Sequence, residues 1–130
     1  MHRFENIKVF KFRIPFSKKK LAFCLPGIGI FVHPEDLNHQ QLLAHEFGHI
    51  LQARKWGFLF FYFRIVPISI WSAIRHNKNG FNHFNTWTEW TANQLAQNYF
   101  SNMEWDVEIY KIKPDAPQIA SNLPKGVNWV

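Results

Sequence analysis

The sequence predicts an α+β fold in which a small, mostly antiparallel sheet packs on two helices. Residues 7–16 alternate between apolar and basic side chains, which is the two-residue period of a half-buried strand. Residues 38–56 have the start and stop signals of a helix, and residues 86–102 have the apolar content of one. A chain of 130 residues fits one domain, which we place over residues 1–130.

The N-terminal part predicts two strands. In the first, the apolar face would consist of Phe10, Phe12, Ile14 and Phe16, with Lys11 and Arg13 on the other face. Residues 17–20 form a predicted turn. The apolar run 28–32 follows Pro26 and Gly27 and predicts a second, shorter strand.

Signals at both ends define the first helix, 38–56. Pro34 and the acidic residues after it are typical of a helix start. Arg54 and Lys55 suit the negative C-terminal end, and Gly57 is a natural stop.

The C-terminal part predicts one helix and one strand. Trp87, Trp90 and Leu95 are among the apolar residues of the helix 86–102. Alternating apolar and acidic residues over 104–109 predict a strand. Three prolines predict that the tail 114–130 is mostly irregular.

Composition narrows the classes of function. The chain is 47% hydrophobic and carries a net charge of +6, which we interpret as a solvated basic surface rather than a dedicated anionic partner. A nucleic-acid-binding module ranks last, because no RRM, KH or zinc-knuckle pattern is present. The lone Cys24 predicts a buried apolar residue, and with no apolar signal segment at the N-terminus we expect a cytoplasmic protein.

Residues 58–74, FLFFYFRIVPISIWSAI, form an unusually apolar segment. It is short for a bilayer span of about 20 residues, Arg64 lies near its middle, and Pro67 should interrupt a helix. Burial within this fold or an oligomer is the favoured interpretation. Peripheral membrane contact is the first alternative and true spanning the second.

The motif His45-Glu46-Phe47-Gly48-His49 has the pattern HExxH. On a helix, residues four apart lie on one face, so the two imidazoles can bind a single metal ion. Imidazole nitrogen is a preferred Zn²⁺ ligand, and Glu46 beside the histidines can accept a proton from water. We therefore predict a zinc site with Glu46 as the general base.

A zinc site of this kind needs a third protein ligand. Lys55 stands where the metzincin pattern requires histidine, so that pattern is excluded. Glu89 is the preferred donor, early in a predicted helix, with Asn93 one turn on to accept the far N–H of an imidazole. The alternatives are that Glu89 belongs to a capping box with Thr86, or that His83 is the ligand.

These two motifs resemble those of gluzincin metallopeptidases, small members of the ImmA/IrrE type in particular. The second motif is similar in carrying Glu89 and then Ala92-Asn93 on a helix. The resemblance implies a zincin-like fold, zinc bound by His45, His49 and Glu89, and Glu46 as catalytic base. It covers residues 28–100, but segment 58–74 has no counterpart, and larger gluzincins carry Asp where Asn93 stands.

The expected function is zinc-dependent hydrolysis of a peptide or protein substrate. The residue that would stabilise the oxyanion is one of four candidates, between which the sequence does not choose: His76, His83, Tyr99 and Tyr110. The alternative is a non-catalytic zinc-binding protein that serves as a scaffold or associates with membranes.

Overall fold

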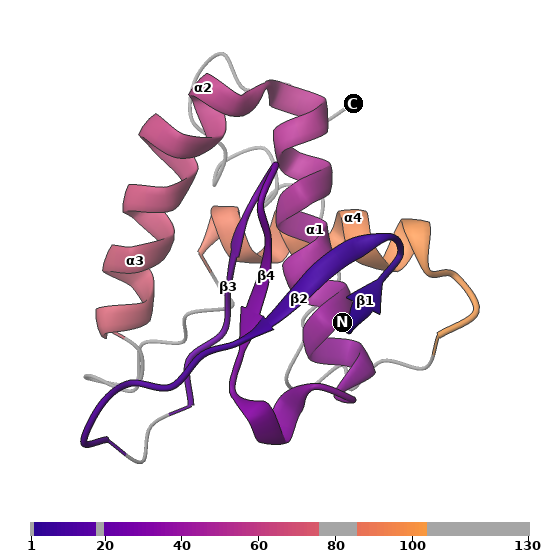
Figure 1. The fold of residues 1–130 in the computed structure, drawn as a ribbon. Coiled ribbons are helices and arrows are strands. Elements are labelled where there is room, and N and C mark those ends of the chain that lie inside the picture. Colours follow the sequence, from indigo (N-terminus) through magenta and orange to yellow (C-terminus); the bar gives the residue numbers. More distant parts are fainter. Residues whose placement is uncertain (1, 18–19, 76–85, 104–130) are drawn as a thin grey trace.

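The computed structural model describes residues 2–17, 20–75 and 86–103 and has an α+β architecture (Figure 1). Strands β1 (Arg3–Phe4), β2 (Ile7–Lys11), β3 (Phe23–Leu25) and β4 (Gly29–Val32) precede all of the described α-helices. The predicted α+β class is thus confirmed. The predicted strand 104–109, the tail 114–130 and His83 lie outside the described residues.

The four strands form one mixed sheet in the order β1-β2-β4-β3. Strand β1 pairs with β2 and β3 pairs with β4, both antiparallel, whereas β2 and β4 are parallel with Val9 opposite Ile30. The parallel pair was not predicted. It is possible because the chain between β2 and β4 is long enough to cross over and adds β3 at the edge on its way.

The predicted faces of the first strand were wrong. Strand β2 ends at Lys11, Val9 is the residue that faces the core, and Phe16 is fully exposed. Phe10 instead stacks on Phe31 across the opposite face, with ring centroids 4.9 Å apart. Both faces of this strand are apolar because a helix covers one and aromatic rings cover the other, so the alternation in the sequence did not identify the core face.

Helix α1 (Gln40–Trp56) is the central element and follows the short 3-10 helix η1 (Pro34–Asp36). The His39 side chain caps it by accepting a hydrogen bond from the Leu42 backbone N–H at 3.1 Å. Gly57 ends it with a φ of 94°, a conformation that L side chains rarely adopt. The predicted helix 38–56 and its stop are confirmed.

The apolar segment is helical throughout, as α2 (Phe58–Phe60), the π-helix η2 (Phe61–Ile65) and α3 (Val66–Arg75). The expectation that Pro67 interrupts a helix was wrong. The wider π turn lies directly before Pro67, and there the Val66 N–H bonds to the Phe61 carbonyl, five residues back. This geometry provides the room that a proline ring needs within a helix.

Helix α4 (Trp87–Tyr99) completes the described fold and confirms the predicted second helix. Helix α1 lies between the sheet and α4, and α2 and α3 run back along one side (Figure 1). The core between sheet and α1 includes Val9, Ile30, Leu43 and Phe47, and Cys24 is buried there as predicted. A second cluster joins α1, the apolar helix and α4 through Ala53, Phe61, Ile65, Trp87 and Trp90.

Candidate metal centre

Helix α1 presents His45 and His49 to the interior of the protein. The two residues are one helical turn apart, and their ring centroids are 5.1 Å apart. The side chains are 3% and 8% exposed, although histidine is seldom fully buried. Their polar atoms therefore need partners inside the protein.

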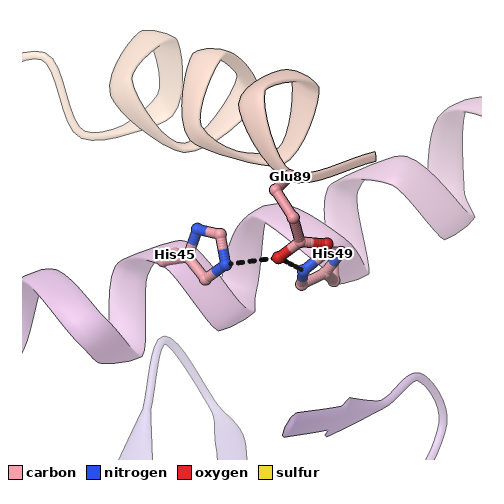
Figure 2. A group of neighbouring side chains, drawn as sticks. All are labelled: His45, His49 and Glu89. Atoms are coloured by element: carbon pink, nitrogen blue, oxygen red, sulfur yellow. Dashed lines mark hydrogen bonds and ion pairs between the residues drawn. The ribbon is translucent and has the colours of Figure 1, made fainter. Parts of the chain in front are cut away.

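Glu89, in the first turn of α4, supplies that partner (Figure 2). Its Oε1 lies 3.1 Å from His45 Nε2 and 3.3 Å from His49 Nε2. Ligand atoms of all three residues lie within 4.8 Å of one another. The structure thus brings together the three residues that the sequence predicted as metal ligands.

A close approach of the two helices makes this convergence possible. At Gly48, a Cβ atom would lie 2.1 Å from the Ala92 carbonyl oxygen, far inside van der Waals contact. Only glycine therefore fits between the two histidines at this helix separation. Gly48 stands between the two histidines in the sequence, but the motif alone did not indicate this close approach.

Each histidine is held by a second hydrogen bond at its other nitrogen. His45 Nδ1–H donates to Asn93 Oδ1 at 2.5 Å, which is the contact predicted for Asn93. His49 Nδ1–H donates to Gln52 Oε1 at 2.7 Å. These acceptors take the Nδ1 proton of each ring, so both Nε2 atoms face Glu89 and would offer a lone pair to a metal once the Nε2 proton is lost.

Gln52 was missed at the sequence level. Besides His49 it binds α4, since its Nε2 donates to the Thr88 carbonyl at 2.6 Å and to Thr91 Oγ1 at 2.7 Å. The residue is fully buried, three positions beyond His49 on α1. Its place one turn after His49 on the predicted helix is the only hint in the sequence, and that spacing does not show the contact to α4.

The carboxylate of Glu89 is oriented from its other side by the apolar helix. Ser69 of α3 donates to Glu89 Oε2 at 2.6 Å. Ser72, a turn later, bonds to Thr86 Oγ1, and the Thr86 side chain makes no capping hydrogen bond to α4. The capping-box interpretation of Glu89 is therefore wrong, and the role of Ser69 could not be anticipated.

Charge inside the cluster favours a proton or a cation. Burial by itself lowers the pKa of His49. The Glu89 carboxylate raises that pKa, and Glu46 and Gln52 add smaller increases. Together these increases exceed the effect of burial, and the resulting pKa is about 9. The Cys24 thiol, buried across the core, has a pKa raised by that burial and by the negative charge of Glu46. The cluster thus provides a negative potential that a metal cation would also satisfy.

The three donors could hold a metal ion, and two imidazoles with one carboxylate are ligand types that zinc accepts. In tetrahedral coordination with bonds of about 2.0–2.1 Å, neighbouring donor atoms lie about 3.3 Å apart. The two distances from Glu89 Oε1 to the imidazoles, 3.1 and 3.3 Å, are close to that edge, and all three donor atoms lie within 4.8 Å of one another. Two neutral imidazoles and one carboxylate also leave a fourth position for water or substrate.

Glu46 lies on α1 next to His45 and is 5% exposed. It is not one of the three residues of the cluster. Two hollows on the described surface, one lined by Arg13 and His33 and one by Lys8 and Ile50, do not include the cluster. Among the oxyanion candidates, Tyr99 is described and donates to Glu5 on the surface at 3.3 Å.

Comparisons of the chain with models of protein families, with curated proteins and with solved structures gave no match.

Proposed function

We propose that the protein is a zinc metallopeptidase of zincin-like fold that uses His45, His49 and Glu89 as ligands and Glu46 as general base. The observation that carries the proposal is the convergence of the three donors on one point, with HExxH on one helix and the glutamate on another. The acceptors behind both rings, Asn93 and Gln52, support the proposal because they hold each Nδ1 and leave each Nε2 facing the point of convergence.

Zinc bound here would polarise the scissile carbonyl and lower the pKa of water towards 7. The remaining chemistry belongs to the protein. Asn93 and Gln52 hold the imidazoles, and Ser69 holds the Glu89 carboxylate, so the ligand set is ordered before metal binding. Glu46 takes the proton from the attacking water and passes it to the leaving amine nitrogen.

The second candidate is a structural metal site that joins α1 and α4. It is favoured by burial, because the side chains of His45, His49 and Glu89 are at most 8% exposed. Structural zinc sites are closed, whereas catalytic sites keep one position open. The candidates differ in Glu46, which a structural site does not need.

Metal content and Glu46→Gln together test the proposal. We expect about one zinc per wild-type chain by elemental analysis, and its loss in His45→Ala and Glu89→Ala. Glu46→Gln should keep its zinc but lose about 10²–10⁴-fold in cleavage of a peptide library. Glu35→Gln, at an exposed ion pair with Lys20, is the matched control and should keep both zinc and activity.

Two results would contradict the proposal. Full zinc content in the double variant His45→Ala/Glu89→Ala would reject the metal site. Full zinc in the wild type with cleavage no greater than in Glu46→Gln would reject the peptidase and favour the structural site.

A further inference from the structure

The outer face of the helix Phe58–Arg75 is an exposed apolar stripe. It consists of Leu59, Phe63, Ile70 and Ile74, which follow one another at intervals of four, seven and four residues along the helix and are 56–79% exposed. Phe58 and Trp71 extend it and are also more than half exposed. A contiguous apolar surface of this kind on a protein marks an interaction site.

The inner face of the same helix is fixed to the protein. Phe61 and Ile65 are buried in the core, and the Tyr62 hydroxyl donates to the Pro26 carbonyl at 2.7 Å. Ser69 and Ser72 make the hydrogen bonds to α4 already described. One face of the helix therefore packs against the rest of the domain, and the opposite, apolar face is exposed.

The charged residues of this helix, Arg64 and Arg75, are both positive. Between residues 47 and 88 the sequence has five Lys and Arg residues and no Asp or Glu. Arg64 and Arg75 lie on the helix and are exposed, with their guanidinium groups over the rings of Phe60 and Trp71 at 5.6 and 5.0 Å. Apolar side chains flanked by cations match the interface of an anionic bilayer.

We propose that the stripe Leu59, Phe63, Ile70 and Ile74 docks the protein on an anionic membrane surface, with the helix Phe58–Arg75 lying in the plane of the interface. The helix is long and apolar enough to cross a bilayer by length and composition. This length is marginal, because 18 helical residues measure about 27 Å and the hydrocarbon layer of a bilayer is about 30 Å thick. Spanning would also break the Ser69, Ser72 and Tyr62 hydrogen bonds, whereas in-plane docking keeps all three.

A second copy of the chain is a poorer occupant. In a two-fold dimer the same patch meets itself, so the basic residues around the stripe would face one another. No acidic residue in 47–88 is available to compensate them. Anionic headgroups provide that compensation without any change in the protein.

Vesicle co-sedimentation of the full chain tests the proposal. We expect binding to vesicles of phosphatidylcholine mixed with phosphatidylglycerol, little binding to phosphatidylcholine alone, and weakening as salt rises. Leu59→Asp/Phe63→Asp should lower the partition constant by at least about 100-fold. Phe16→Asp/Leu21→Asp introduces the same charge at exposed apolar residues outside the helix and should lower it far less.

Three outcomes would overturn the proposal. These are absence of binding to the mixed vesicles at low salt, full binding by Leu59→Asp/Phe63→Asp, and a wild-type dimer that this variant dissociates without any vesicle binding. If Leu59→Asp/Phe63→Asp does not fold, the variant Ile70→Asp/Ile74→Asp replaces it in the same assay. Zinc content, measured in every variant, should be unchanged, so docking is tested independently of the peptidase proposal.

Discussion

Replacing Gly48 with alanine tests whether the approach of α1 to α4 sets the geometry of the metal centre. The added Cβ would lie 2.1 Å from the Ala92 carbonyl oxygen and 2.8 Å from its carbon. An ordinary carbon–oxygen contact is about 3.3 Å or longer, so the helices must separate locally by about 1 Å. The obstacle is backbone, which cannot rotate away as a side chain would.

Two opposing free energies determine the result. Overpacking costs typically about 1–3 kcal/mol, and a clash with backbone belongs at the upper end. Alanine is favoured over glycine within a helix by about 1 kcal/mol. We therefore expect a net loss of about 2 kcal/mol in the free energy of unfolding, which is roughly 6–10 °C in Tm.

The effect on zinc should be larger than the effect on folding. Glu89 lies on α4 and moves with it when the helices separate. A metal site tolerates only about 0.5 Å of ligand displacement before its coordination geometry is lost. Zinc affinity, measured by competition with a chelator, should fall by about tenfold or more. Urea unfolding of the chelated protein separates the two effects, with Lys55→Ala on exposed α1 surface as the control.

The contrary outcome is that Gly48→Ala unfolds at a higher urea concentration than the wild type and keeps its zinc affinity. That result would mean that helix propensity dominates and that the two helices are not held at this separation.

Three further predictions concern the cluster. Asn93→Ala should weaken zinc binding by about 10–100-fold, because His45 loses the acceptor that orients it, and the same chelator competition measures the change. Ser69→Ala should weaken it less, since Thr88 still donates to Glu89 Oε2 at 3.3 Å; an unchanged affinity would show that Ser69 does not position Glu89. In the metal-free protein the pKa of His49 is raised from 6.5 to about 9. Protonation of His49 therefore stabilises the folded protein fully below pH 6.5. This contribution, at most about 3 kcal/mol, is lost as the pH rises to about 9. Urea unfolding in the presence of a chelator between pH 6 and 9 measures that loss, which should be absent in Glu89→Gln.

The sequence predicted the parts of this site that depend on local periodicity. HExxH places His45 and His49 one turn apart on one face of α1, and Glu89 and Asn93 are likewise one turn apart on α4. Glu89 was predicted as the third ligand from its place early in the second helix, with Asn93 one turn on, and not from any local spacing to the histidines.

Contacts between distant segments could not be predicted in this way. Ser69 reaches Glu89 only because of the path of the helix after Gly57, and Gln52 reaches α4 only at the separation that Gly48 permits. Neither contact has a periodic signal in the sequence. The faces of β2 were predicted wrongly for a related reason, since apolar residues cover both faces and alternation alone does not identify the core.

The π turn Phe61–Ile65 has a consequence for the register of everything after it. One extra residue in a helical turn rotates the following helix by about 100° relative to a regular α-helix. Ser69 and Ser72 point towards α4, and Ile70 and Ile74 away from it, in the phase that this extra residue sets. Deleting a single residue within 61–65 would turn the serines out of the protein and apolar side chains towards Glu89, so chain length in this turn is as constrained as the identity of the ligands.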